Sequence, residues 1–336
     1  MSRSTCVLLA LLCLPPRLSF ADSALSSAAT VYKLGVKLEN GHAGIGSATL
    51  VAPGRLVTSC HTTRGATEIF VLHREGQLAA NAAQRDVRHD LCLLAVPALR
   101  GQSAPRLASR ELQVGQAVTA LGYGLGYGLS ITEGRITALY ELDNAHVVRT
   151  SAAFPRGASG GGLFDEQGRL MGILTFRASI DDQLNYVVPI DWVEHLLDNG
   201  STAGASPSSL AFWEDNATDQ PIFLHAARLE YERAWSELEA VAIDWALREP
   251  DNAEAWLALG RARVELRREK DAVLGLRHAV TLETDNTRAW YWLAFAYHQI
   301  GFENEFVHAS THLERLDPQL AGRLLAAARS RRNLQR

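Results

Sequence analysis

The hydrophobic pattern of this chain changes near residue 200, and this change constrains the fold more than any other feature of the sequence. Before that point, the apolar residues occur in short segments that are separated by Gly, Pro and Asp. Many short segments at regular spacing are typical of β-barrels and sandwiches. The segments that we expect to be strands are Val31–Leu38, Gly46–Val51, Arg55–Thr58, Ile69–Leu72, Leu91–Val96, Ala117–Leu121, Gly134–Leu139, His146–Thr150, Leu170–Thr175 and Asn185–Val188. A short closing helix is expected at Asp191–Leu197.

From about residue 219 the pattern is helical and repeats. Pro250, Thr284 and Pro318 follow one another at intervals of 34 residues, and Trp256 and Trp290 are separated by the same interval. A 34-residue period with these residue types is the signature of the tetratricopeptide repeat (TPR), a helix pair that must stack on its neighbours to bury its apolar face. The sequence therefore predicts an all-α TPR solenoid. Its expected units are residues 219–250, 253–284 and 287–318, with a capping helix at 319–332.

The N-terminus has the parts of a secretory signal peptide. Arg3 supplies a positive charge, residues 6–14 form an apolar core too short to cross a bilayer, and Ser19-Phe20-Ala21 matches a cleavage site. An uncleaved anchor is the alternative, but Pro15, Pro16 and Arg17 interrupt the apolar run. We therefore predict export with cleavage after Ala21 and no stable membrane span afterwards. The destination would be the periplasm in a Gram-negative host, and otherwise the protein would be secreted.

Composition adds two inferences. The chain has 33 basic and 37 acidic residues and a formal charge of −4, so a strongly basic face and nucleic-acid binding are not expected. Residues 199–218 are rich in Ser, Gly and Ala, which is typical of a linker. The predicted organisation is a signal peptide (1–21), a short segment (22–29), a β-domain (30–198), this linker, and the helical repeats (219–332).

The string Gly157-Ala158-Ser159-Gly160-Gly161 is the first indication of chemistry. Glycines beside a serine allow a sharp turn and a close approach of a substrate carbonyl. The backbone N–H groups of Gly157 and Ser159 could then converge on a developing oxyanion. A Gly-rich turn without function is the alternative reading.

A nucleophilic serine needs a base and a group that orients the base. His61 follows the expected strand Arg55–Thr58, and Asp90 opens the apolar segment that begins at Leu91. A carboxylate against such a strand would be partly desolvated and would stay ionised near His61. Asp86 is the rival, but it lies outside the apolar run and is expected to be exposed.

The strings VTSCH, HDLCLL and GASGG, in this order, resemble a trypsin-like (chymotrypsin-fold) serine peptidase of the bacterial HtrA/Deg type. The resemblance covers residues 30–198 and implies two six-stranded β-barrels with the active site between them. It assigns a catalytic triad to His61, Asp90 and Ser159, and an oxyanion hole to the N–H groups of Gly157 and Ser159. No cofactor and no metal are implied. The TPR-like region stands where this group carries PDZ domains.

The substrate pocket is expected to involve five residues. Ala153 stands where trypsin-type enzymes carry a pocket aspartate, so nothing there would neutralise Lys or Arg. Residues 175–177 should form an edge that pairs with an extended substrate. We expect a small or medium apolar residue on the acyl side of the cut. The predicted pocket residues are Ala153, Thr175, Phe176, Arg177 and Val188.

Cys60 and Cys92 are the two cysteines that remain after removal of the signal peptide, and an even count in an exported protein favours a disulfide. If the triad forms, the two cysteines must be close, so the bond would brace His61 and Asp90. The alternative is a zinc site of Cys60, His61, His89 and Cys92, which would leave the GASGG motif unexplained.

The sequence thus predicts an exported serine endopeptidase with a role in protein quality control. Its partners would be protein or peptide substrates, together with an unidentified protein bound to the repeats. A catalytically silent peptide-binding scaffold and an esterase-like hydrolase are the alternatives.

Overall fold

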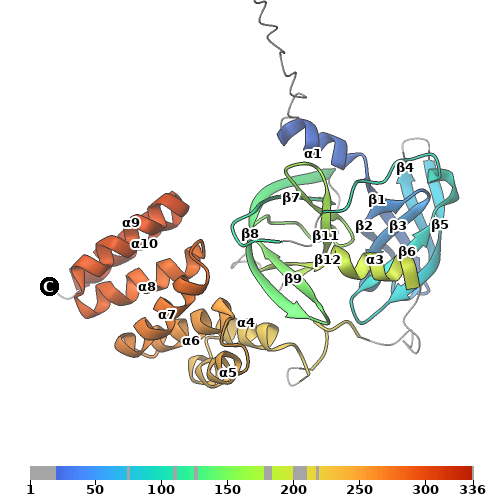
Figure 1. Cartoon of the computed structure of the whole chain (residues 1–336). Helices are drawn as coiled ribbons and strands as arrows, with labels where there is room; N and C mark the ends of the chain where they lie inside the picture. The colour runs from blue at the N-terminus through green and yellow to red at the C-terminus, as the bar shows by residue number, and fades with distance from the viewer. Residues whose placement is uncertain are drawn as a thin grey trace, which may run out of the picture.

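The computed structural model describes residues 20–73, 76–108, 112–124, 128–177, 184–199, 210–216 and 219–334, with side chains from 23 to 328. Figure 1 shows two β-barrels side by side and a helical region next to the second barrel. Most of the predicted signal peptide and the Ser/Gly-rich residues 200–209 lie outside the described residues. Helix α1 (Phe20–Ala28) begins within the predicted signal peptide, so the predicted cleavage would remove its first two residues.

The first barrel is closed and antiparallel, with the strand order β1-β2-β3-β6-β5-β4. Apolar side chains such as Leu34, Leu50 and Leu94 fill its interior because alternate residues of a strand face the same side. A one-turn helix, α2 (Cys60–Thr63), follows β3 directly. The strands are β1 (Val31–Leu38), β2 (Ala43–Ala52), β3 (Arg55–Ser59), β4 (Ala66–His73), β5 (Gly76–Asp86) and β6 (Leu91–Ala95).

The second barrel is also closed and antiparallel, in the order β10-β11-β12-β9-β8-β7. After β12 the chain enters α3 (Ile190–Asn199), where Trp192 stacks on His89 of the first barrel at 3.8 Å between ring centroids. The strands are β7 (Ala117–Tyr123), β8 (Leu129–Leu142), β9 (Ala145–Thr150), β10 (Gly162–Asp165), β11 (Leu170–Arg177) and β12 (Asn185–Pro189).

The predicted strands and the closing helix all occur, and two further strands complete the barrels. The unpredicted strands are β5, which is mostly exposed and rich in Ala, Asn and Gln, and the four-residue β10. Neither strand has a strong apolar alternation of its own. Each is held in its barrel by pairing with its neighbours, which the sequence pattern does not reveal. The two six-stranded barrels implied by the resemblance are confirmed.

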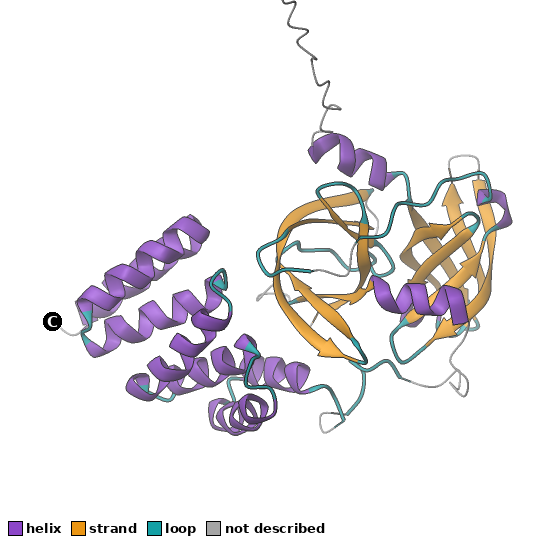
Figure 2. Ribbon diagram, in the orientation of Figure 1, coloured by secondary structure: helices purple, strands orange, loops and turns teal. Residues whose placement is uncertain are grey.

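The C-terminal part is all helical (Figure 2). Helix α7 begins 34 residues after α5, and α9 begins 34 residues after α7. In the same way, α8 begins 34 residues after α6. Helix boundaries therefore follow the sequence period. The helices are α4 (Ile222–Glu232), α5 (Trp235–Arg248), α6 (Ala253–Glu265), α7 (Glu269–Leu282), α8 (Thr287–Ile300), α9 (Glu303–Leu316) and α10 (Pro318–Leu334).

A buried ionic cluster joins the second barrel to these helices. Arg149 of β9 donates to both carboxylate oxygens of Glu254 in α6, at 2.9 and 3.1 Å, and to the hydroxyl of Tyr140 at 2.6 Å. Arg288 of α8 donates to Glu254 at 3.3 Å. The ring of Tyr140 also stacks on Phe223 of α4 at 4.2 Å between centroids. Polar and apolar contacts together hold the helices against the barrel.

None of the helices described here combines the length and the apolar character needed to cross a bilayer.

Candidate active site

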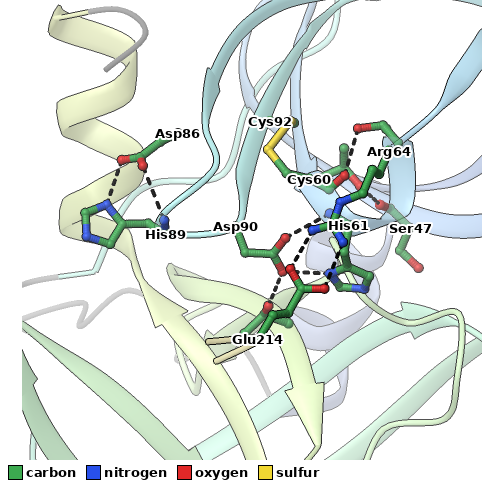
Figure 3. Close-up of a disulfide and its surroundings, with 12 residues drawn as sticks. Ser47, Cys60, His61, Arg64, Asp86, His89, Asp90, Cys92 and Glu214 are labelled. Atoms are coloured by element: carbon green, nitrogen blue, oxygen red, sulfur yellow. Dashed lines mark hydrogen bonds and ion pairs between the residues drawn. A yellow bond between two sulfur atoms is a disulfide. The ribbon is translucent and has the colours of Figure 1, made fainter. Parts of the chain in front are cut away.

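The first barrel brings His61 and Asp90 together. His61 lies in α2, at the end of β3, and Asp90 immediately precedes β6, which pairs with β3. Asp90 accepts two hydrogen bonds from His61: its Oδ1 from the backbone N–H at 2.9 Å, and its Oδ2 from ring nitrogen Nδ1 at 2.7 Å. Figure 3 shows this pair beside the disulfide. Asp90 therefore fixes the orientation of the imidazole and directs Nε2 away from the carboxylate.

The backbone of Asp90 adopts a conformation that few L-residues adopt. Its φ is 60° and its side chain is fully buried. The Cys60 N–H donates to the Asp90 carbonyl at 3.1 Å, and the Thr175 hydroxyl donates to Oδ2 at 2.5 Å. Left-handed backbone at a non-glycine residue persists where surrounding contacts impose it, often at functional sites.

The second barrel supplies Ser159, in a loop that is anchored to the first barrel. The N–H of Ser47 in β2 donates to the Ser159 carbonyl at 2.9 Å, and the Ser47 hydroxyl donates to the Gly157 carbonyl at 3.0 Å. Gly160 has a φ of +88°, and a Cβ there would lie 2.0 Å from the Ser47 carbonyl oxygen. Glycine is therefore required at residue 160.

The loop presents two free donors. Gly157 has a φ of +92° and follows Pro155 and Arg156 in a turn closed by a hydrogen bond from the Ala158 N–H to the Pro155 carbonyl. Within the described part of the chain, the N–H groups of Gly157 and Ser159 make no hydrogen bond. Both predicted oxyanion donors are thus available to a ligand.

Thr175 connects the two halves of the site. Its hydroxyl donates to Asp90, and its carbonyl accepts a 2.8 Å hydrogen bond from the Ser159 hydroxyl. Among the described contacts, Ser159 Oγ is bonded to this carbonyl and not to His61. Thr175 thus links Ser159 of the second barrel to the Asp90–His61 pair of the first barrel.

The other predicted pocket residues differ in exposure. Ala153 is exposed and Arg177 is half-buried, whereas Val188 is fully buried in the core. Phe176 is buried and stacks on Tyr186 at 4.7 Å between centroids. Thr175 is also buried, and its hydroxyl is used by Asp90. Ala153 and Arg177 are therefore the better placed of the five to meet a substrate.

Part of the predicted linker lies in the site. Residues 210–216 pack on the first barrel: Ala211 and Phe212 are fully buried, and the Phe212 N–H donates to the Arg88 carbonyl at 3.0 Å. The ring of Trp213 meets His61 edge-on, with centroids 5.3 Å apart. The linker composition belongs to residues 200–209, whereas Leu210–Asp215 is apolar, aromatic and acidic. The adjacent Phe212 and Trp213 were the sequence signal that could have revealed this segment.

Three charged groups surround the His61 ring. Burial by itself lowers the pKa of His61, but the hydrogen bond and charge of Asp90, together with the charge of Glu214, raise the pKa above the ordinary value, against an opposing effect of Arg64. Arg64 donates to both carboxylate oxygens of Glu214, at 2.9 and 2.5 Å. Neither Glu214 nor Arg64 was expected from the sequence to contribute here.

The cysteines form the predicted disulfide between Cys60 and Cys92. His89, a ligand in the alternative zinc site, instead contacts Asp86 through Nδ1 at 2.6 Å and Asp143 through Nε2 at 3.0 Å. Figure 3 shows the His89–Asp86 pair apart from His61. In the part of the chain covered by the structure, no group of three or more His, Cys, Asp or Glu side chains could hold a metal.

The expected exposure of Asp86 is wrong. Asp86 is buried, and it also accepts a hydrogen bond from the His89 N–H at 3.2 Å. Pairing with a histidine three residues later compensates for the burial of its charge. Asp90, and not Asp86, contacts His61.

Comparisons with known proteins concern the part of the chain that forms the barrels. A family model described as a trypsin-like peptidase domain matches residues 46–173. Serine endoprotease DegS of Haemophilus influenzae is 28% identical over 166 residues, which are 46% of this chain and 49% of that protein. Periplasmic serine endoprotease DegP of Salmonella typhimurium is 30% identical over 164 residues, which are 45% of this chain and 34% of that protein.

The chain thus spans about half of the length of the first of these relatives and about a third of the second. Among solved structures, the active form of a protease from M. tuberculosis has a TM-score of 0.50 at 23% identity, over 61% of this chain and 99% of that one. This likeness concerns the fold. Residues 46–173 thus match the trypsin-like peptidase domain model, and a little under half of this chain is similar in sequence to the serine endoproteases DegS and DegP.

Proposed function

We propose that the chain is a serine endopeptidase with Ser159, His61 and Asp90 as its catalytic triad. The hydroxyl of Ser159 attacks the carbonyl carbon of the scissile peptide bond, and His61 Nε2 takes the hydroxyl proton. His61 then returns that proton to the leaving amine, and water repeats the sequence in reverse to release the acyl group. Asp90 holds the imidazole and stabilises its cationic form.

The observation that carries this proposal is the pairing of His61 with a fully buried Asp90 that also binds Thr175, the residue whose carbonyl holds Ser159. These hydrogen bonds support the proposal because they link Ser159 through Thr175 to the Asp90–His61 pair. The bond from Ser159 to Thr175 must break before attack. Catalytic hydrogen bonds are often misaligned in a free enzyme and align when substrate binds.

The free N–H groups of Gly157 and Ser159 would form the oxyanion hole. Each preorganised donor of this kind lowers the transition-state barrier by about 3–4 kcal/mol. The turn at Pro155–Ala158 and the contacts of Ser47 support this role because they hold the loop before substrate arrives. We propose a small or medium apolar residue on the acyl side of the cut, since Ala153 offers no charge.

For the remainder of the chain we propose export to the periplasm or the medium, and TPR repeats that recruit a substrate or partner protein for quality control. The spacing of 34 residues between equivalent helices supports the repeat assignment. The name of the relative periplasmic serine endoprotease DegP supports the compartment for a Gram-negative host.

Hydrolysis of an unfolded protein is the test of this proposal. The full chain should cleave a denatured polypeptide into fragments, and the Ser159→Ala variant should be slower by a factor on the order of 10⁶. Asp86→Asn is a matched control, because Asp86 pairs with His89 and not with His61. Equal cleavage by wild type and Ser159→Ala, or hydrolysis of simple esters without cleavage of any polypeptide, would contradict the proposal.

A further inference from the structure

Residues 211–215 lie outside both barrels, yet they border the catalytic histidine. This segment connects the described end of the second barrel domain to α4 and is anchored at both ends. Phe212 is fully buried and its ring meets Phe176 at 5.8 Å between centroids, while Asp215 is paired with Arg88. The segment is therefore part of the folded site.

The residue at its centre is held between two parts of the site. The Trp213 ring stacks on Phe176 with centroids 5.0 Å apart and an interplanar angle of 15°, and it meets His61 edge-on. The Trp213 carbonyl accepts a 3.0 Å hydrogen bond from Gln220, just before α4. Among the described residues, nothing accepts a hydrogen bond from the buried indole N–H, so ring contacts alone hold the side chain.

The site remains accessible with Trp213 in this position. The His61 side chain retains 25% of its exposure, and Ser159 is only half-buried. A ring that closed the cleft would have buried both groups. Trp213 therefore forms a wall beside the accessible part of His61 without covering it.

The position of this wall indicates which substrate residue it meets. An extended substrate paired with residues 175–177 directs alternate side chains to opposite sides. If the side chain of the residue at the cut points toward Ala153, the preceding side chain points the other way, toward His61 and the aromatic rings. Apolar aromatic walls favour a large apolar side chain.

We propose that Trp213 is a specificity-determining residue that, beside His61 and supported from behind by the buried Phe176, forms a subsite for a large apolar side chain at the second position on the acyl side of the cut. This inference rests on the proposed function for the direction of the bound peptide. It means that a segment beyond the second barrel completes the substrate cleft. It also ties the cleft to the helical region through Gln220.

Peptide binding to the Ser159→Ala chain tests this inference without requiring turnover. The probes are two extended peptides that differ only in Leu or Gly at the second position. The Leu peptide should bind about tenfold more tightly, as expected for partial burial of a leucine side chain. Adding Trp213→Ala should reduce this preference to less than about twofold, and adding Trp213→Phe should retain most of it, since the indole N–H is unused.

Leu210→Ala is the matched control, because Leu210 directly precedes this segment but is exposed. It should leave the preference unchanged, and thermal unfolding should show that each variant remains folded. Three outcomes would overturn the inference: no binding of either peptide, a preference that survives Trp213→Ala, or tighter binding of both peptides to Trp213→Ala, which would make Trp213 a cover. If the Ser159→Ala chain prefers the Leu peptide but the wild-type chain cleaves no polypeptide, only the proposed function would be overturned.

Discussion

The charge of His61 depends on three neighbours, Asp90, Glu214 and Arg64. His61 accepts a proton only when it is neutral, so its raised pKa moves the rise of activity to a pH above the ordinary histidine value of about 6.5. Glu214 raises this pKa and Arg64 lowers it. Glu214→Gln should therefore lower the midpoint of the activity profile, and Arg64→Gln should raise it.

The rate of reaction with a fluorophosphonate, followed from pH 5 to 9, measures both midpoints. The paired variants control for each other, because each removes one member of the same ion pair. Midpoints that move in the same direction would show that loss of the pair, and not charge, changes His61. A flat profile would exclude His61 as the base.

Thr175 is a positioning residue, because its hydroxyl acts on the substrate only through Asp90. Thr175→Val removes one donor to a buried carboxylate, which should cost about 1–3 kcal/mol and reduce kcat/KM about 10–100-fold. Thr175→Ser keeps the hydroxyl and should restore most of the activity. The pH midpoint of the activity profile distinguishes this role from a loss of packing. Thr175→Val should raise that midpoint, because Asp90 without the Thr175 donor interacts more strongly with the protonated ring of His61.

The residues of the site differ in how far the sequence could predict them. His61, Asp90 and Ser159 lie in short strings of characteristic order, and in the structure His61 contacts Asp90 while Thr175 binds both Asp90 and Ser159. Trp213 and Glu214 could not be placed, because their role depends on where a connecting segment folds back. The burial of Asp86 was missed for a similar reason, since its partner His89 is itself in contact with Asp143 and Trp192, which follow far along the chain.

At the scale of elements, the disulfide connects α2 to β6. It joins residues 32 positions apart, and a loop of this length stabilises the fold by about 3–4 kcal/mol in the chain-entropy model. The double variant Cys60→Ala/Cys92→Ala should lose this amount in urea unfolding. It should also react more slowly with a fluorophosphonate, because the cysteines flank His61 and Asp90.

Reductant provides the control for the disulfide. It should destabilise the wild type to the level of the double variant and leave the double variant unchanged, since the two other cysteines lie in the predicted signal peptide. A wild type that is insensitive to a strong reductant under unfolding conditions would contradict a stabilising bond.

A strand could be predicted from the sequence where its own residues form a clear apolar pattern. β1 was predicted with its observed boundaries, because its apolar residues are dense and turn residues follow it. β5 was not predicted because its outer positions are polar or small. β10 was not predicted because four residues are too few to show an alternation of apolar and polar residues. Helix boundaries in the repeats followed the 34-residue spacing, which is a longer and stronger signal.

For the whole molecule, the Arg149–Glu254–Arg288 cluster is the main polar contact between barrel and helices. Burial alone would raise the pKa of Glu254, but the charges of Arg149 and Arg288 lower it, so the carboxylate stays ionised. Glu254→Gln leaves Arg149 buried without its counter-charge. The free energy of unfolding should fall by about 3–5 kcal/mol.

Glu68→Gln is the matched control for that measurement. Glu68 pairs with Lys37 at 2.6 Å, but both side chains are more than half exposed (59% and 52%), so its removal should cost less than about 1 kcal/mol. Equal effects of the two variants in urea unfolding would show that the cluster does not hold the helices to the barrel.

The most direct test of the account is whether Ser159 is an activated nucleophile. The full chain is treated with a fluorophosphonate, and the modified residue is identified by mass spectrometry, with Ser159→Ala and His61→Ala as controls. The account predicts a single adduct on Ser159, labelling that increases with pH as His61 becomes neutral, and no labelling of either variant. A folded wild type that remains unlabelled at pH 8, or that is labelled equally when His61 is replaced, would contradict it.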